Sequence, residues 1–493
     1  MPFEKPIRSA ALPGNWFGVL RPFLACLLVA GCASTAVQPD TALSFTVPAT
    51  WSESSNAAGQ QDLLHWWTRF NDPELNGLVG DALNNNLAVK SARATLRQAW
   101  ALRDIADAAL LPTLDGTASV QRNRSPGLGT NNQFQVGAAA NWVPDIFGAA
   151  RSGRAAAEAV ALSDQASLGD MQVAIAAEVG LNYIALRSAQ ARFDIALGNI
   201  RNQEETLQLT QWRQQAGLLT ALEVEQASSA LDQTRAQLPA LQIIVVQSQH
   251  ALALLTGQPP NQLSMQLSEV QPVPRADDSF ALSIPAETLR QRADVQAAEF
   301  NVVAAQQRVN QATAARLPAF SLGGSIGLSA LTAAALTNGA SVVSGLAAGV
   351  TLPVFDGGAR RAEVDLQQAA QTQAQLAYQT TVLTALSDVE NALIALKNDR
   401  QRLISLSTAG ASAASASQLA RQRYGSGLID FQVVLQTQLT QLLAQDAVAL
   451  ANADVSSDQV RLIKALGGGW QPDRSDGPIS TPISTKTNQA NPP

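Results

Sequence analysis

The chain contains few of the residues that most often carry out chemistry. Among 493 residues there are two cysteines, two histidines and three methionines. The histidines, His65 and His250, lie far apart in sequence, and no cysteine or carboxylate cluster has the spacing of a metal site. No phosphate-binding loop, dinucleotide fingerprint or nucleophile-elbow motif occurs in its required context. The composition therefore predicts a protein that is not an enzyme and has no cofactor and no resident metal.

Positive charge and long apolar runs are also scarce. The chain has 33 Lys and Arg against 39 Asp and Glu, a net charge of -6, and no basic patch stands out, which argues against a nucleic-acid partner. Beyond the N-terminal region no uninterrupted run of about 18 apolar residues is present, so the sequence predicts no transmembrane helix. If this chain crosses a membrane, it must do so with strands.

The N-terminus has the layout of an export signal. Residues 1–31 carry basic residues followed by an apolar run at 22–31 that is too short to span a membrane. The sequence Val-Ala-Gly-Cys that ends at Cys32 is similar to a bacterial lipobox, in which cleavage precedes a cysteine that is then acylated. An ordinary signal peptide with a chance cysteine is the alternative. Because Ala33 rather than aspartate follows, similarity to sorted lipoproteins implies the outer membrane.

The sequence contains an internal duplication. "AALLPTL" at 108–114 corresponds to "AARLPAF" at 314–320, an offset of 206 between the Leu-Pro pairs, and Ile-Ala-Leu recurs at 184–186 and 394–396, an offset of 210. Self-similarity over such a span indicates two copies of one structural plan. The additional residues of the second copy are expected in a loop, where extra length costs little entropy.

Each copy begins with two alternating runs of apolar and polar residues. This period of two predicts β-hairpins at 113–143 and 320–352. Each run is about nine to eleven residues, the length that a tilted strand needs to cross a bilayer. A soluble sheet with one wet face is the alternative that alternation alone leaves open.

Long helices are expected after each hairpin. Apolar residues recur every seven positions, as at Val179 and Leu186 or at Val389 and Leu396, which is typical of a coiled coil. No proline interrupts the spans of roughly 149–214 and 359–424, so each helix would be about 100 Å long. Glycines then predict reversals, after which helices of about 40 residues run back. The predicted turns are Gly217-Leu218 and Gly427-Leu428.

The fold class that follows is a mixed α+β membrane protein built from two repeats of a β-hairpin and a long helical hairpin. Four strands cannot close a membrane barrel, which needs about eight, so oligomerisation is predicted. The expected segments are a signal peptide (1–31), an acylated N-terminal segment (32–75), a first repeat (76–257), an equatorial linker (258–284), a second repeat (285–470) and a disordered tail (471–493).

Four stretches together resemble the TolC-type outer-membrane efflux channels, in particular their lipoprotein branch. They are "WWTRFNDPELNGLV" at 66–79, "IPAETLRQRADVQAAE" at 284–299, "LPVFDGGARRAEV" at 352–364 and "RYGSGLIDFQVVLQTQ" at 423–438. The resemblance implies a homotrimer whose twelve-stranded β-barrel sits in outer-membrane lipid and continues as a helical barrel through the periplasm. It also implies a passive exit duct for small molecules, working with a periplasmic adaptor (a membrane fusion protein) and an inner-membrane transporter.

The resemblance also assigns roles to residues near the helical turns. Gly217, Leu218, Gly427 and Leu428 would dock the adaptor, and the narrow periplasmic aperture would lie just beyond them. The candidate aperture residues are Glu223, Glu225, Gln226, Asp430, Phe431, Val434, Leu435 and Gln436. Relatives often carry an aspartate where this chain has Gln436, so we expect a closure held more by apolar contacts and hydrogen bonds, with Glu223 and Glu225 setting a cation preference.

Two other functions remain open at this stage. One is a lipid-anchored coiled-coil scaffold or adaptor without a pore, and the other is the exit duct of a type I protein secretion system. The four membrane-length strands argue against the scaffold, which has no use for paired hairpins. The transported substrate cannot be read from the sequence, because a passive duct leaves selection to the pump.

Overall fold

Two helices of 67 residues each dominate the computed structural model, which describes residues 43–52, 63–125, 129–276, 285–468 and 470. They are α4 (Ala149–Gln215) and α9 (Ala359–Gly425), and at about 1.5 Å per residue each is about 100 Å long. All the described residues fall in the unit Thr41–Pro493. Cys32 and the tail 471–493 lie outside the described residues.

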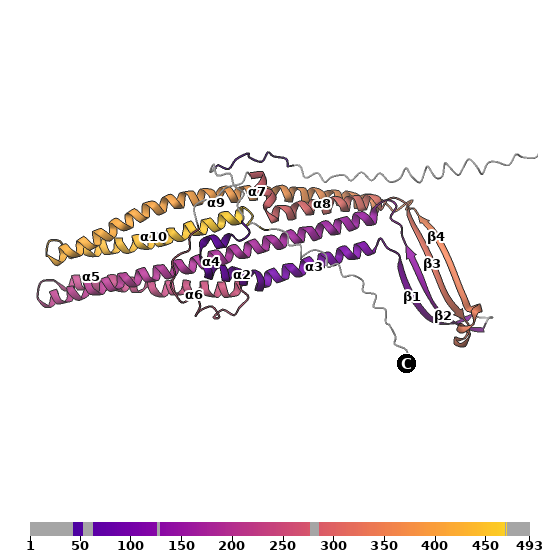
Figure 1. Cartoon of the computed structure of the whole chain (residues 1–493), viewed down its shortest axis with the longest axis horizontal. Helices are drawn as coiled ribbons and strands as arrows, with labels where there is room; N and C mark the ends of the chain where they lie inside the picture. Colours follow the sequence, from indigo (N-terminus) through magenta and orange to yellow (C-terminus); the bar gives the residue numbers. More distant parts are fainter. Residues whose placement is uncertain (1–42, 53–62, 126–128, 277–284, 469, 471–493) are drawn as a thin grey trace, which may run out of the picture. The chain divides into compact units, whose positions relative to one another are not determined.

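The long helices form because their apolar residues repeat every seven positions and nothing interrupts them. In α9 the apolar residues at intervals of seven are all buried: Val382, Val389, Leu396 and Leu403. Each helix starts after a glycine in the left-handed region, with φ of 84° at Gly148 and 88° at the corresponding residue of the second copy. The predicted coiled-coil hairpins are therefore present, as Figure 1 shows.

The two return helices differ. The second copy returns through one helix, α10 (Phe431–Ala465), whereas the first returns through α5 (Ala221–Arg235) and α6 (Gln237–Leu255). Pro239 explains the break, because it has no N–H to donate to the Arg235 carbonyl and its ring crowds that carbonyl. The sequence had predicted an unbroken return helix of about 40 residues.

The return segment of the first copy is also the most apolar helical stretch. Within the described residues, Ala221–Leu255 is the one helical span long and apolar enough to cross a membrane by length and composition alone. The sequence predicted no such helix, because no uninterrupted run of about 18 apolar residues is present. In the structure α5 and α6 both pack along α4 as the second arm of a helical hairpin.

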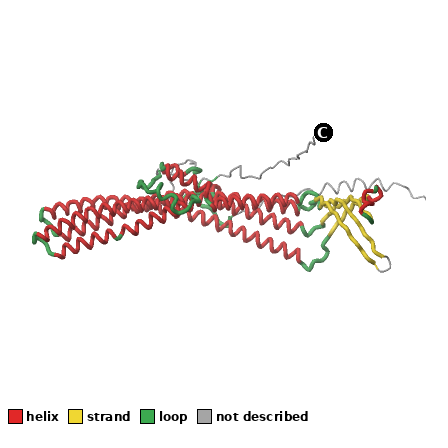
Figure 2. Tube along the Cα trace, turned by 90° about the horizontal axis from the view of Figure 1, so that it is seen from below, coloured by secondary structure: helices red, strands yellow, loops and turns green. Residues whose placement is uncertain are grey.

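Four strands form one antiparallel sheet at the end of the helices opposite the turns (Figure 2). They are β1 (Thr113–Ser125), β2 (Gly129–Trp142), β3 (Ala319–Ala330) and β4 (Val342–Thr351), in the order β1-β2-β3-β4. The first hairpin lies within the predicted range 113–143, but its strands of 13 and 14 residues are longer than the nine to eleven expected. β2 and β3 join the two copies through pairs such as Trp142↔Leu322. Both outer strands, β1 and β4, have a free edge within the chain.

The duplication is visible in the element bounds. α3 (Leu87–Ala108) and α8 (Ala293–Ala314) have 22 residues each and start 206 positions apart (293 - 87). α4 and α9 start 210 positions apart (359 - 149). Most of the difference arises in the second β-hairpin, whose connection holds the short helices η2 (Ala333–Thr337) and η3 (Gly339–Ser341). Extra length was accommodated in a loop, as expected.

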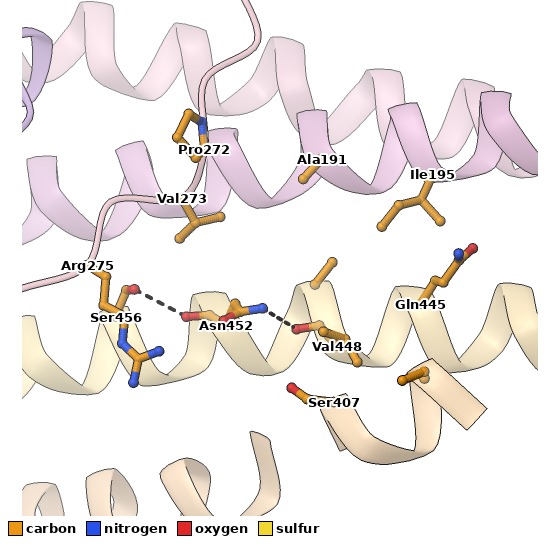
Figure 3. Close-up of a pocket in the computed structure, with 13 residues that line it drawn as sticks. Ala191, Ile195, Pro272, Val273, Arg275, Ser407, Gln445, Val448, Asn452 and Ser456 are labelled. Carbon is orange, nitrogen blue, oxygen red and sulfur yellow. Dashed lines mark hydrogen bonds between the residues drawn. The ribbon is translucent and has the colours of Figure 1, made fainter. Parts of the chain in front are cut away.

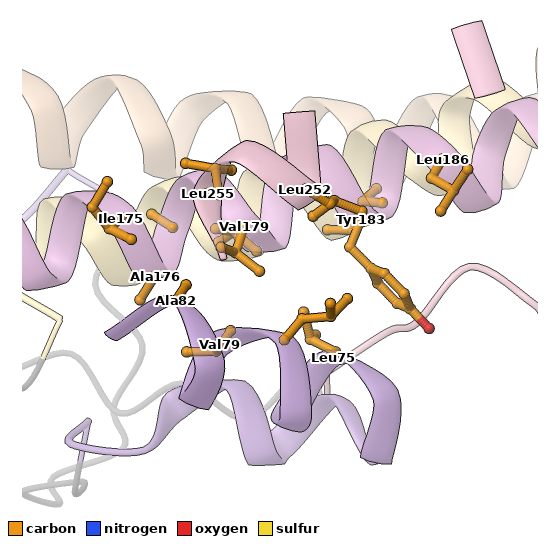
Figure 4. Packing of buried hydrophobic residues seen from close by; sticks show 14 of the residues in the cluster. Leu75, Val79, Ala82, Ile175, Ala176, Val179, Tyr183, Leu186, Leu252 and Leu255 are labelled. Atoms are coloured by element: carbon orange, nitrogen blue, oxygen red, sulfur yellow. The ribbon is translucent and has the colours of Figure 1, made fainter. Parts of the chain in front are cut away.

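A compact core lies where short N-terminal elements pack against the middle of the long helices. η1 (Trp66–Phe70) and α2 (Pro73–Asn85) bury Trp66, Leu75 and Val79 against Val179 of α4 and Leu252 of α6, and Figure 4 shows part of this packing. Trp66 is 2% exposed and is therefore a packing residue of this core. On the second copy, α7 (Pro285–Gln291) lies beside α8 and α9.

Buried polar contacts fix α2 on α4. Asp72 accepts from the first backbone N–H groups of α2, and its other oxygen accepts from the Tyr183 hydroxyl at 2.7 Å. Arg187 is fully buried and donates to Glu74 at 2.5 Å and to the Glu269 carbonyl at 2.6 Å. Each charged group here has a partner. These contacts therefore fix linker residues 258–276 and α2 at one position along α4.

Candidate channel wall, tips and aperture

The sheet has one apolar and one polar face. The apolar face consists of Leu114, Gly116, Ala118, Val120, Phe134, Val136, Ala138, Ala140, Trp142, Phe320, Leu322, Gly324, Ile326, Leu328, Ala330, Val342, Ser344, Leu346, Ala348 and Val350. Large members are exposed, with Leu346 at 96% and Leu114 at 75%. A chain in water does not leave such a face uncovered, so it indicates a lipid or protein contact.

The polar face is lined by small hydroxyl, amide and glycine residues. It includes Thr113, Asp115, Thr117, Ser119 and Gln121 of β1, Gln133, Gln135 and Asn141 of β2, and Ser321, Ser325 and Ser329 of β3. Gln133 donates to the Ser329 hydroxyl at 3.3 Å across this face. Asp115 is the only charged residue that the strands place here. Such a face suits contact with water.

The two helical turns at the other end have the same geometry. After α4 the Leu218 N–H donates to the Arg213 carbonyl at 2.8 Å, and after α9 the Leu428 N–H donates to the Arg423 carbonyl at 2.9 Å. Gly217 and its counterpart have φ of 73° and 72°, so both turns are Schellman motifs that need glycine at this position. The leucines that follow, Leu218 and Leu428, are 72% and 74% exposed. An apolar side chain thus projects from each of the two turns, which we call the tips of the hairpins.

An arginine connects the two tips. The Arg213 guanidinium of α4 donates to the carbonyls of Tyr424 and Gly425 at the end of α9, each at 3.2 Å. Its central carbon lies 4.4 Å from the centre of the Tyr424 ring. This contact was not predicted from the sequence. The pairing depends on how the two hairpins are staggered along their axes, and no local sequence signal reports that.

Two of the expected aperture residues are buried inside the chain. Phe431 and Val434 pack against Ala227, Ala420 and Tyr424, and each is at most 4% exposed. Within one chain they therefore pack the two hairpins together. Among the neighbouring residues, Leu435 and Gln226 are half-buried, whereas Gln436 and Asp430 are exposed.

The two acidic residues of α5 differ in what they contact. Glu223 accepts from the Thr220 N–H at 3.0 Å and from the Thr220 hydroxyl, which forms a capping box at the start of the helix. The Thr220 hydroxyl lowers the pKa of Glu223, so within one chain this carboxylate is held charged. Glu225 is exposed and has no hydrogen bond of this kind.

The described residues also form a groove between the two helical hairpins. It has a volume of about 670 Å³ and is lined by α4, α9, α10 and the segment that contains Val273, with Ile195, Val448 and Asn452 among its residues (Figure 3). Asn452 donates only to the Val448 carbonyl of its own helix. The groove holds no nucleophile beside a base, and no group of three or more metal-binding side chains occurs among the described residues.

A four-stranded sheet with an exposed apolar face, followed by two 100 Å helical hairpins, defines the class of outer-membrane channels that extend into the periplasm. The comparisons agree, because the family model of outer membrane efflux proteins matches residues 78–258 and 284–468. The chain belongs to this family. It is an outer-membrane component of an efflux pump, located in the outer membrane and extending into the periplasm.

Relatives and solved structures span almost the whole chain. The pyoverdine export outer membrane protein OpmQ of Pseudomonas aeruginosa is 33% identical over 91% of this chain and 96% of its own length. Nodulation protein T of Rhizobium leguminosarum bv. viciae is 30% identical over 90% and 92%. The structure of the outer-membrane channel OprN superposes with a TM-score of 0.80 at 32% identity, covering 88% of this chain and all of OprN.

Proposed function

We propose that three copies of the chain assemble into one passive exit duct. The observation that carries this proposal is the sheet, whose two outer strands have free edges and whose apolar face is exposed. In lipid every backbone group must be paired, so the β1 edge of one copy requires the β4 edge of the next. Three sheets of four strands give a twelve-stranded barrel, which falls in the size range of outer-membrane barrels. The polar face then lines the lumen.

The helical hairpins of the trimer form the periplasmic part of the duct. Their tips, which carry Leu218 and Leu428, meet a periplasmic adaptor that connects the duct to an inner-membrane transporter. The equal geometry of the two turns supports this assignment, because it offers six similar apolar contacts per trimer. Isolated exposed leucines at a rigid turn suit a partner groove better than they suit water.

The tips also close the duct at rest. The Arg213 contact with Tyr424 holds the two hairpins of one chain together, and Gln436, Glu225 and Asp430 remain exposed beside it. We assign the aperture to these exposed residues, together with Glu223 and Gln226, and assign Phe431 and Val434 to the packing behind it. Opening then requires the hairpins to separate.

The cargo is a small organic molecule. The polar face offers no strongly charged ring beyond Asp115, and OpmQ, by its name, takes part in export of pyoverdine, a small molecule. Choice among such molecules falls to the transporter, because small hydroxyl and amide side chains bind none of them selectively. A type I secretion duct for polypeptides is the second candidate, and the cargo separates the two.

The test uses the full-length mature protein. Light scattering in detergent should give the mass of a trimer, and single proteins in planar bilayers should give small, discrete conductance steps that grow when the tips are loosened. In cells lacking the gene, a fluorescent dye should accumulate until the chain is restored, while secretion of polypeptides stays unchanged. A monomer without conductance would contradict the duct and favour the scaffold, and loss of polypeptide secretion alone would favour the secretion duct.

A further inference from the structure

Charge is distributed unevenly over the sheet. The strands and their hairpin loops, residues 113–142 and 319–351, contain three charged residues: Asp115, Arg122 and Arg124. Asp115 lies on the polar face near the helical end of β1. Arg122 pairs with Asn132 and Arg124 with Thr130, so both arginines continue the apolar face toward the hairpin loop at the far end. Both side chains are exposed.

The register locates the arginines relative to the apolar face. Val120 is opposite Phe134, and Phe134 is opposite Ala330, so these three residues form the last apolar row across β1, β2 and β3. Arg122 is the next residue after Val120 on the same face of β1, two residues closer to the hairpin loop. From Thr113 to Arg122 is nine residues (122 - 113), about 30 Å along the strand. At a tilt of about 40° this gives a height of about 23 Å, close to the ~25 Å apolar band of membrane barrels.

The arginines have no anionic partner from the sheet. The neighbouring hairpin and the loop 331–341 carry no acidic residue, and a second copy placed against the β1 edge would present β4, which carries no charge either. Six arginines per trimer therefore face outward near one level, and the described strands and the loop 331–341 supply no carboxylate to balance them. A membrane-facing cation at the edge of the apolar band favours anionic lipid headgroups.

We propose that Arg122 and Arg124 bind phosphate groups of lipid in the outer leaflet of the outer membrane. The guanidinium group suits this task, because its fork of N–H donors matches phosphate oxygens in a bidentate geometry. The spacing of two residues puts both side chains on one face of the strand, so a single headgroup with two phosphates can contact both. The inference rests on the proposed function, since it requires the apolar face to lie in lipid.

The experiment measures lipid binding to the purified full-length trimer by native mass spectrometry. The probes are lipid A with both phosphates, the same lipid after removal of its phosphates, and inorganic phosphate alone. The variants are Arg122→Gln with Arg124→Gln, and a swap of residues 121–124 from Gln-Arg-Asn-Arg to Arg-Gln-Arg-Asn. The swap preserves composition and net charge but moves both guanidinium groups to the polar face. Arg97→Gln with Arg201→Gln, two exposed helical positions, is the matched control.

We expect the wild type and the helical control to retain lipid A and to lose it when the phosphates are removed. The double variant should raise the Kd for lipid A about 30-fold, from about fivefold for each arginine, and the swap should behave like the double variant. Equal binding of both lipids by the wild type, or undiminished binding by the swap, would overturn the proposal. Competition by inorganic phosphate as effective as lipid A would also overturn it, because the site would then serve a free anion.

Membrane insertion is measured separately so that the two proposals can fail independently. Each variant is reconstituted with lipid vesicles and floated on a density gradient, and its heat-resistant trimer is followed by electrophoresis. Variants that float as trimers but bind lipid A like the wild type contradict only the arginine site. A wild-type protein that neither floats nor forms a trimer contradicts the duct itself.

Discussion

Arg213 lies against the ring of Tyr424, with 4.4 Å between the guanidinium carbon and the ring centre, and donates to the carbonyl of the same tyrosine. One residue thus contacts both the side chain and the backbone of the other hairpin. A cation over an aromatic ring contributes about 0.5–1 kcal/mol at partly exposed sites, and the hydrogen bonds to a carbonyl add to it. The contact is therefore strong enough to bias the position of the tips but weak enough to be broken by a partner.

The first prediction concerns this contact. Arg213→Gln removes the cation and the fork of donors, so the tips should separate more often and the mean conductance in planar bilayers should rise several-fold. Arg423→Gln, the corresponding change in the other copy, is the control and should leave the conductance near that of the wild type. A variant at Arg213 that conducts like the wild type would show that other contacts hold the aperture closed.

The tip leucines give the second prediction. Leu218→Asp with Leu428→Asp puts charge on two exposed side chains, so folding should be kept while docking to the adaptor is lost. Dye efflux should fall to the level of cells without the gene, and cross-linking to the adaptor should disappear. Met265→Asp, at a position 88% exposed in the linker, is the control. Unchanged cross-linking in the double variant would count against the tips as the docking site.

The ion preference of the duct could be set by acidic residues at the tips or by Asp115 in the barrel. We expect weak cation selectivity from Glu223 and Glu225 at the tips, and Glu223→Gln with Glu225→Gln should remove it. Asp115→Asn is the competing change, because it removes the only charge of the polar face in the barrel. Reversal potentials in a salt gradient distinguish them. If selectivity survives the tip double variant and vanishes with Asp115→Asn, the limiting charge lies in the barrel.

The lowered pKa of Glu223 leads to a prediction about the pH dependence of cation selectivity. Its pKa is lowered by the Thr220 hydroxyl, so the capping box contributes stability above the ordinary pKa of glutamate, and that contribution is lost as the pH falls through the lowered value. Cation selectivity due to Glu223 should therefore persist as the pH is brought down to the ordinary value of 4.5. Thr220→Ala should move the loss of selectivity to higher pH. An identical pH profile in Thr220→Ala would refute the assignment.

For Asp458 the expected pH dependence has the opposite direction. Burial raises its pKa, and Asp399 across the helix interface raises it further, although Arg461 opposes the shift. The folded chain then holds the proton more tightly than the unfolded chain, so stability is lost as the pH rises from 3.8 through the raised value. Asp458→Asn should remove this part of the pH dependence of the unfolding temperature. Asp454→Asn, one turn earlier, should not, and equal slopes in both variants would be inconsistent with the assignment.

The last prediction concerns the lipid anchor. Cys32 should carry lipid, and Cys32→Ala should abolish metabolic labelling with palmitate while the heat-resistant oligomer stays in outer-membrane fractions. The reason is that the barrel supplies its own apolar band, so the anchor assists residence but does not create it. A Cys32→Ala protein that is entirely soluble and monomeric would show the reverse.

The sequence predicted those elements whose limits are set by local chemistry. The helix expected at roughly 359–424 spans Ala359–Gly425, because a glycine precedes it, a glycine follows it and no proline interrupts it. The alternating strands were found for the same reason, since a period of two identifies a strand and its two faces. The expected turns were located by their glycines, whose positive φ no other residue adopts as readily.

Features that depend on packing were not predicted. The spacing of three residues between Phe431 and Val434 puts both on one face of a helix, but it does not say what that face contacts. In the structure this face contacts α9 of its own hairpin, through Ala420 and Tyr424, and also Ala227 of the other hairpin. The Arg213 contact likewise depends on the stagger of α4 against α9. Pro239 was visible in the sequence, yet its effect inside the return helix was missed because the helix continues beyond it.

The break at Ala236 has a consequence for symmetry. In a trimer of this chain six return helices surround the duct, but only the three from the first copy contain the break, while the three α10 helices are continuous. A continuous helix moves as a rigid rod, whereas a helix with a missing hydrogen bond can bend there at little cost. Two equal copies per chain would let the six return helices bend with sixfold symmetry. Because only the first copy has Pro239, the symmetry of this bending is threefold. Bending amplitude should alternate between neighbouring hairpins around the ring.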